Sequence, residues 1–311
     1  NMEKETNRLV VVSNRLPVVL ERDEEEWRIG PGAGGLITAL APVMQANHGL
    51  WIGWPGCGDD APLAELFERF GAEHGYTLQG VPLTEDEVER YYRGFSNEAL
   101  WPLFHDLLGY CNFSLENWGT YREVNRRFAE VVAGASRNDD FVWIHDYQLA
   151  LVGSQLRELG VRQTLAFFLH IPFPSLDLYR RLPWKIEILR ALMEYDLLGF
   201  QTLRDRRNFV SCATTLLPEV EVVTRQRHYT ILRYNGRMVK VGHFPISIDF
   251  NDFAGQAATD EVADAAWYLH ENYEQRQLML GIDRLDYTKG IPERFLAFER
   301  ALEKYPDLRQ K

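Results

Sequence analysis

The chain has 311 residues, 46% of them hydrophobic and 25% charged, with a formal net charge of −11. These values are typical of a globular protein with one large domain or two unequal ones. The charge, with no basic stripe or tail, argues against nucleic acid as the main partner. No apolar run approaches the roughly 18 residues of a membrane span. An anionic small substrate stays compatible, because cationic loops can dominate the field inside a cleft.

The three cysteines, Cys57, Cys111 and Cys212, have no CxxC spacing, so the sequence indicates neither a zinc site nor a disulfide framework. The polar N-terminus lacks the basic-then-apolar order of a signal peptide. We therefore expect a cytoplasmic protein.

Apolar runs of strand length alternate with helical patterns along the chain. We expect strands at 9–13, 50–54, 77–81, 141–145, 164–170, 197–201, 238–241 and 277–282, and helices at 36–46, 62–70, 85–92, 121–135, 149–159, 186–194, 205–217, 260–273 and 292–304. Thr84 and Glu87 form a capping box for the third helix. Continuously apolar strands predict an α/β fold with a Rossmann-like, doubly wound parallel sheet covered on both faces.

The composition changes near residues 243–249. The one helix, strand and helix that follow are too short to enclose a core of their own. We expect an N-terminal domain over residues 1–245. Residues 246–311 would then begin a second Rossmann-like domain whose remainder lies outside the chain.

Arg15 follows the first strand, just before Pro17. Ligands of an open parallel sheet bind beyond the carboxyl ends of its strands, so Arg15 is placed to hold a phosphate. The alternative is a solvent-facing arginine after an edge strand.

Residues 30–35 match GxGxxG, but the acidic excursion at 21–27 separates them from their strand, so a dinucleotide site is disfavoured. Gly34 and Gly35 let the backbone approach a ligand, or make a plain tight turn.

Aromatic side chains at Trp54, Tyr92 and Trp101 suit the apolar faces of sugar rings, although any one such residue is more often part of a core than of a site. Asp146 follows the apolar strand 141–145 and can accept hydrogen bonds from sugar hydroxyls or cap the next helix. His170 ends another buried strand. A lone histidine there is usually structural, but this one is expected to share a sheet edge with Arg15 and Asp146.

Arg284 and Lys289 lie in a loop between the apolar run 278–280 and a helix. Two cations beside a helix N-terminus suit a diphosphate leaving group, whose negative charge grows as its bond breaks. The alternative is a surface loop whose cations only pair with Asp283 and Asp286.

Nine ordered segments together resemble the trehalose-6-phosphate synthase family, glycosyltransferase family 20, whose members are retaining enzymes of the two-domain GT-B fold. They are VVSNRLP at 11–17, GGL at 34–36, WIGW at 51–54, YYRGFSN at 91–97, LWPLFH at 100–105, WIHDY at 143–147, HIPFP at 170–174, DLLGFQT at 196–202 and RLDYTKG at 284–290. The resemblance runs from residue 8 to the last residue.

The resemblance implies transfer of glucose from UDP-glucose to glucose 6-phosphate, giving α,α-trehalose 6-phosphate and UDP, with no metal and no other cofactor. It implies catalytic roles for His170, Asp146, Arg284 and Lys289. The implied acceptor-binding residues are Arg15, Trp54, Tyr92, Trp101 and Asp146, and the implied donor-binding residues are Gly34, Gly35, His170, Arg284 and Lys289.

Asp106 and Ser247 depart from the family pattern, which commonly has Tyr and Gly there. Because most of the family's second domain is missing, we expect this chain alone to bind acceptor weakly and to turn over poorly or not at all. Two alternatives stay open: the same donor chemistry on another phosphorylated acceptor such as glycerol 3-phosphate, and a catalytically silent regulator that binds sugar phosphate. The nucleotide of the donor, a fused phosphatase and assembly into a homo-oligomer also stay open.

Overall fold

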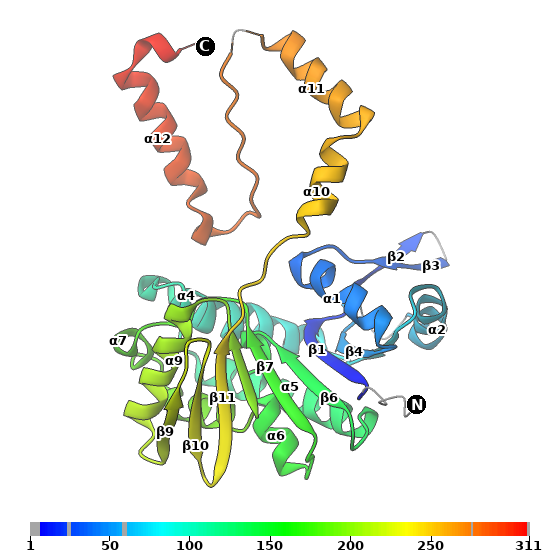
Figure 1. The fold of residues 1–311 in the computed structure, drawn as a ribbon, viewed down its shortest axis with the longest axis vertical. Helices are drawn as coiled ribbons and strands as arrows, with labels where there is room; N and C mark the ends of the chain where they lie inside the picture. The colour runs from blue at the N-terminus through cyan, green and yellow to red at the C-terminus, as the bar shows by residue number, and fades with distance from the viewer. Residues whose placement is uncertain (1–6, 24–25, 58–60, 275, 310–311) are drawn as a thin grey trace. The chain divides into compact units, whose positions relative to one another are not determined.

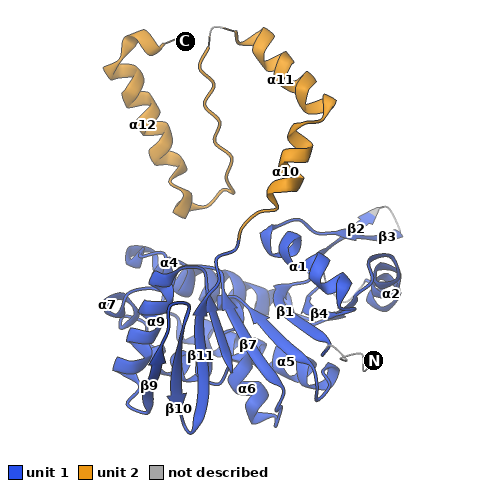
Figure 2. Ribbon diagram, in the orientation of Figure 1, with its two compact units in different colours: residues 1–246 blue, residues 247–311 orange. Residues whose placement is uncertain are grey.

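The structure, a computed structural model, describes residues 7–23, 26–57, 61–274 and 276–309. It divides into two units, residues 1–246 and residues 247–311 (Figures 1 and 2). The division falls one residue after the boundary expected from composition.

Unit 1 is built on a nine-stranded sheet with the order β5-β4-β1-β6-β7-β8-β11-β10-β9. Its parallel strands are β1 (Leu9–Arg15), β4 (Leu50–Trp54), β5 (Thr77–Gly80), β6 (Phe141–His145), β7 (Thr164–Leu169), β8 (Leu197–Phe200) and β11 (Arg237–His243). Seven of the eight expected strands are thus confirmed, and so is the Rossmann-like sheet.

The expectation of an entirely parallel sheet is wrong at one edge. β9 (Val220–Arg225) and β10 (Tyr229–Tyr234) run antiparallel to their neighbours. The reason is local, because Asn235 and Gly236 both have positive φ, 48° and 79°, which a two-residue hairpin turn requires. A second pair of antiparallel strands, β2 (Val18–Asp23) with β3 (Glu26–Pro31), contains the described residues of the acidic excursion, 21–23 and 26–27, and forms a separate two-stranded sheet.

The helices of unit 1 follow the expected pattern. They are α1 (Gly35–Ala46), α2 (Leu63–His74), α3 (Glu85–Glu87), α4 (Trp101–Phe104), α5 (Leu115–Ala135), α6 (Val152–Glu158), α7 (Leu176–Tyr179), α8 (Lys185–Leu192) and α9 (Leu203–Leu216), with short 3₁₀ turns η2 (Leu108–Tyr110) and η3 (Tyr147–Leu149). The capping box is confirmed, since the Thr84 hydroxyl accepts from the Glu87 N–H and Glu87 Oε2 accepts from the Thr84 N–H. The helix expected at 85–92 is different in kind: η1 (Val88–Leu100) is a π-helix of 13 residues.

Two hydrophobic cores lie on the two faces of the sheet. Along β1, Val10 and Val12 belong to the larger core and Val11 belongs to the smaller one, as the alternation of a strand requires. The expected cover on both faces is incomplete over β6, β7 and β8. There a cavity of about 520 Å³ lies against the sheet, lined by residues of α1 together with Trp143 and Phe168.

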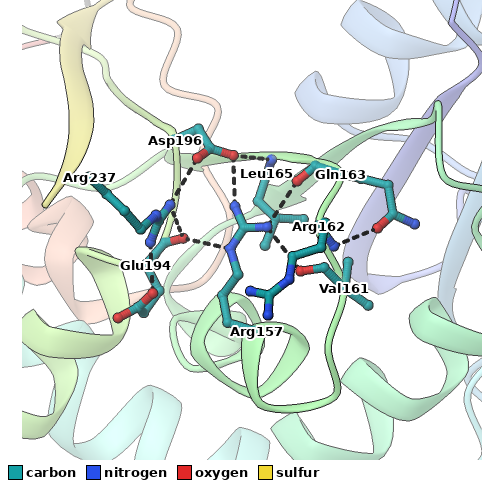
Figure 3. A network of polar contacts seen from close by, with 8 residues as sticks. All are labelled: Arg157, Val161, Arg162, Gln163, Leu165, Glu194, Asp196 and Arg237. Carbon is teal, nitrogen blue, oxygen red and sulfur yellow. Dashed lines mark hydrogen bonds and ion pairs between the residues drawn. The ribbon is translucent and has the colours of Figure 1, made fainter. Parts of the chain in front are cut away.

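Asp196 organises the amino ends of β7, β8 and β11 (Figure 3). Its carboxylate accepts from Arg157 Nη2 at 2.7 Å, from the Leu165 N–H at 2.8 Å and from Arg237 Nη2 at 2.8 Å. Arg237 Nη1 also donates to Glu194 at 2.7 Å. This polar network fixes the register of three strands at the end opposite to their carboxyl ends.

Unit 2 contains α10 (Phe250–Ala257), α11 (Asp260–Asn272), α12 (Ile291–Lys304) and the 3₁₀ turns η4 (Tyr287–Lys289) and η5 (Pro306–Leu308). Both expected helices are confirmed, but the strand expected at 277–282 is wrong. A strand is held by a ladder of hydrogen bonds to a neighbour, and the described part of unit 2 has no other strand to supply one. Within the described residues, no helix combines the length and the apolar character needed to cross a membrane.

Candidate active site

Four polar or aromatic side chains end four adjacent strands of the sheet. Trp54 ends β4 and Arg15 ends β1, while Asp146 directly follows β6 and His170 directly follows β7. These strands are parallel neighbours, so their carboxyl ends meet at one edge, where an open α/β sheet binds its ligands. The structure therefore brings together residues that are up to 155 positions apart in the sequence.

Arg15 is exposed but held in place. The Cζ atom of its guanidinium lies 4.8 Å from the centre of the Trp54 ring. On another side it packs against the backbone of Gly56, where φ is 83° and a methyl group would overlap the guanidinium. A fixed fork of N–H donors binds a phosphate at a lower entropic cost than a mobile one. Sequence reasoning missed Gly56, although the dipeptide Pro55-Gly56 is a turn signal.

The backbone of Asp146 is strained. Its φ of 75° and ψ of 167° fall in a region that is essentially restricted to glycine. Its Oδ1 atom accepts from the N–H groups of Tyr147 and His170, each at 3.1 Å. Burial nevertheless raises the pKa of Asp146 to about 6. Asp146 thus caps η3, as one alternative anticipated, and also presents a carboxylate at the sheet edge.

His170 is paired with a second histidine, His145. The His145 Nδ1 and His170 Nε2 atoms lie 3.0 Å apart, and the His145 Nε2 atom is buried without a hydrogen-bond partner among the described residues. Burial lowers the pKa of His170 to about 4 and, with the nearby His170, lowers that of His145 well below its usual value. Both rings are therefore neutral at physiological pH. His145 was not among the predicted site residues, although it precedes Asp146 in the sequence.

The π-helix η1 carries the aromatic candidates. Tyr92 lies within it and Trp101 follows its last residue, and both are half-buried against the larger core. Tyr147 links this helix to the sheet edge: its hydroxyl donates to Asn97 Oδ1 at 2.8 Å, and its ring lies 5.7 Å from that of Trp101. These contacts place Trp101 close to the segment that carries Asp146.

Gly34 and Gly35 form the N-terminus of α1. Gly34 has a φ of 143°, and a side chain at either glycine would point into open space. The helix has no side-chain cap and no acidic residue in its first turn, so its N–H groups remain available to an anion. The next residue, Leu36, lines the 520 Å³ cavity together with His170. The first turn of α1, directly after the two glycines, and the histidine pair therefore border one hollow.

Arg284 and Lys289 belong to unit 2 and are exposed there. Burial opposes the ionisation of Asp286, but its hydrogen bonds from Thr288, together with both cations, keep its pKa below the usual value. Asp283 pairs instead with Arg294 at 2.6 Å. The alternative in which the two cations pair with Asp283 and Asp286 thus has partial support, since Asp286 lies within electrostatic reach of both.

The chemistry of the site is that of binding and positioning. In unit 1, a fixed guanidinium, a carboxylate, neutral imidazoles and aromatic faces suit a phosphorylated, hydroxyl-rich molecule. Within residues 7–23, 26–57, 61–274 and 276–309, no three His, Cys, Asp or Glu side chains gather as they would around a metal ion. Unit 1 is a Rossmann-like α/β domain of the type found in GT-B glycosyltransferases.

Comparison with known proteins agrees with this fold. The sequence model of glycosyltransferase family 20 matches residues 7–311, so the chain belongs to that family. It is 43% identical over 302 residues to a trehalose-6-phosphate synthase of Mycolicibacterium gilvum, covering 94% of this chain and 59% of that protein. The chain thus spans about six-tenths of the length of this curated relative.

Two solved structures are similar over nearly the whole chain. One, from E. coli and bound with UDP-2-fluoro glucose, superposes with a TM-score of 0.79 at 35% identity over 98% of this chain and 63% of that one. The other is an α,α-trehalose-phosphate synthase (UDP-forming) from Burkholderia xenovorans in complex with glucose-6-phosphate. Its TM-score is 0.79 at 30% identity, over 97% of this chain and 64% of that one.

Proposed function

We propose that the protein transfers glucose from UDP-glucose to glucose 6-phosphate, with retention, to give α,α-trehalose 6-phosphate and UDP. The observation that carries this proposal is the convergence of Arg15, Asp146 and His170 at one sheet edge of a family 20 chain. Support comes from the two similar structures, one bound with a UDP-glucose analogue and the other with glucose-6-phosphate. Unit 1 would bind the acceptor, and unit 2 would begin the donor-binding domain.

The acceptor is assigned to the strand ends. Arg15 would hold its phosphate, with Tyr92, and the aromatic faces of Trp54 and Trp101 would pack against the sugar. The carboxylate of Asp146 would accept hydrogen bonds from acceptor hydroxyls, which orients the attacking oxygen. Binding to the phosphate and to the hydroxyls at once fixes both the position and the rotation of the sugar.

The donor is assigned to the cations of unit 2 and to the hollow beside α1. Arg284 and Lys289 would stabilise the charge that grows on the diphosphate, and Gly34, Gly35 and His170 would contact the donor. The bond from the anomeric carbon to the diphosphate breaks as its bond to the acceptor oxygen forms on the same face. The acceptor proton passes to a leaving phosphate oxygen. This scheme requires neither a metal nor a covalent intermediate.

The activity test uses the full-length protein and measures UDP release with UDP-glucose and a panel of acceptors: glucose 6-phosphate, glycerol 3-phosphate and unphosphorylated glucose. We expect glucose 6-phosphate to be preferred. Release with glycerol 3-phosphate alone would select the alternative acceptor, and no release with any acceptor while sugar phosphate still binds would select the silent regulator.

The site test compares Arg15→Gln with the wild type. Loss of a charge-assisted hydrogen bond should raise KM for glucose 6-phosphate by about 10- to 100-fold. The same change should leave the slow reaction with unphosphorylated glucose unaltered, because that acceptor has no phosphate to lose. An equal effect on both acceptors would place the phosphate elsewhere.

A further inference from the structure

Three arginine side chains surround a small cavity at the antiparallel edge of unit 1. The cavity has a volume of about 230 Å³ and lies between the first turns of α9 and the turn that joins β9 to β10. Its lining consists of Arg206, Arg207, Val210, Arg225, Gln226 and Thr230. The chain as a whole carries a net charge of −11, so this concentration of positive charge runs against its overall balance.

The central arginine, Arg206, is buried without a counter-ion. Only 7% of the residue is exposed, and its Nη1 atom donates to the backbone carbonyl of Arg227 at 3.3 Å. Burial lowers its pKa, and repulsion from Arg207 and Arg225 lowers that pKa further. Among the described residues, none of these three guanidinium groups has a carboxylate partner within ion-pairing distance.

A buried cation that faces two further cations destabilises the fold unless something compensates it. An anion in the cavity would turn this net repulsion into net attraction, because all three guanidinium groups would then attract the same anion. Guanidinium groups match the oxygens of a phosphate bidentately, and the Gln226 amide and Thr230 hydroxyl at the cavity wall add neutral donors.

The size of the cavity selects a small ligand group. Its 230 Å³ equals the share of about seven or eight liquid waters at about 30 Å³ each. That is enough for one phosphate group and its nearest waters, and it lies below the range of about 300–1,000 Å³ of sites that enclose a drug-sized molecule. A phosphate monoester can place its phosphate inside and leave its sugar or polyol outside.

This cavity is distinct from the candidate active site. Arg15 lies on β1, whereas the cavity adjoins β9 and β10, and β6, β7, β8 and β11 lie between them in the sheet. We propose that Arg206, Arg207 and Arg225 form a second anion site, which takes the phosphate group of a dissolved small molecule such as inorganic phosphate or a sugar phosphate. The proposal does not depend on the reaction proposed above.

The experiment measures binding of radiolabelled inorganic phosphate to the full-length protein at fixed ionic strength, in an Arg15→Gln background that weakens the acceptor site. We expect saturable binding close to one phosphate per chain. Adding Arg207→Gln and Arg225→Gln, both at exposed positions, should weaken that binding at least ten-fold. The matched control is Arg233→Gln on β10, which pairs with Glu221 at 3.3 Å and should leave binding unchanged.

A second measurement follows the melting temperature. Phosphate should raise the Tm of the Arg15→Gln protein and of its Arg233 control more than the same ionic strength of chloride does, but not the Tm of the double arginine variant. Absence of phosphate binding in the Arg15→Gln protein would overturn the proposal. So would equal binding by the double variant and the control.

Discussion

The Nδ1 atom of His145 lies 3.0 Å from the Nε2 atom of His170, so the two neutral rings share one proton between them. Two arrangements satisfy this contact. If His170 were the donor, His145 would carry its proton on Nε2, where a buried N–H would have no acceptor among the described residues. Proteins avoid such orphaned N–H groups. We therefore expect His145 to donate, which leaves the proton of His170 on Nδ1.

Replacing His145 with Phe should remove this control over His170. The expected result is a shift of His170 toward its Nε2–H tautomer and a fall in transfer rate of about ten-fold, the equivalent of one hydrogen bond. The tautomer is read from ¹⁵N chemical shifts of the histidine rings. His145→Asn, whose amide N–H can occupy the place of Nδ1–H, should preserve both. Unchanged ¹⁵N shifts of His170 in the Phe variant would contradict the assignment.

Gly56 and Gly236 provide a matched pair of variants. Both have positive φ, 83° and 79°, so alanine should cost each about 1–2 kcal/mol of unfolding free energy. Only Gly56 packs against Arg15, whereas Gly236 faces open space. We expect Gly56→Ala to raise KM for the phosphorylated acceptor and Gly236→Ala to leave it unchanged. Urea unfolding and steady-state kinetics check the two effects separately, and equal KM values for the pair would show that Arg15 does not depend on Gly56.

Asp146 should make stability depend on pH. Its pKa is about 6 in the folded protein and lower in the unfolded chain, so the folded state binds its proton more tightly. The resulting stability is fully present below the unfolded pKa and is lost as pH rises through 6. Asp146→Asn, which is always neutral, should therefore gain stability over the wild type by about 1–3 kcal/mol between pH 4 and pH 7. Urea unfolding of both proteins across this range provides the test, and a constant difference would rule out the raised pKa.

Asp196 should matter for stability and not for chemistry. Asp196→Ala removes the acceptor of Arg157, Leu165 and Arg237 at the amino ends of the strands, which should cost about 2–4 kcal/mol. Asp139→Ala, at an exposed position, should change the unfolding free energy by less than about 0.5 kcal/mol. Both variants should keep the wild-type KM values when assayed below their unfolding transitions. A raised acceptor KM in Asp196→Ala alone would show that the network reaches the site.

The order of strands and helices in unit 1 could be predicted from the sequence, because buried parallel strands are short, apolar and regularly spaced. The edge strands β9 and β10 were not predicted, although Asn235-Gly236 is a strong hairpin signal. Exposed apolar residues such as Val222 and Val223 interrupt the alternation of apolar and polar residues that marks a strand. The strand expected at 277–282 failed for the opposite reason. Its apolar pattern is present, but a strand also needs a neighbour, and no local pattern reports on that.

The candidate site was readable in part for a similar reason. Residues that end adjacent parallel strands must lie at one edge, so Arg15, Asp146 and His170 could be grouped in advance. Trp101 could not be placed relative to Tyr92, because the sequence predicts a helix only over 85–92. In the structure one π-helix, η1, runs from Val88 to Leu100 and ends directly before Trp101, and long π-helices are too rare to be expected from a sequence pattern.

The conformation of Asp146 has a consequence for the history of this position. Replacement by glycine would relax the backbone there, but it would also remove the carboxylate that accepts from the Tyr147 and His170 N–H groups. The strained aspartate can therefore persist only while these two hydrogen bonds, or the binding of a ligand, offset the strain. A descendant that had lost the activity would keep the aspartate if the hydrogen bonds alone offset the strain, and would drift to glycine if they did not.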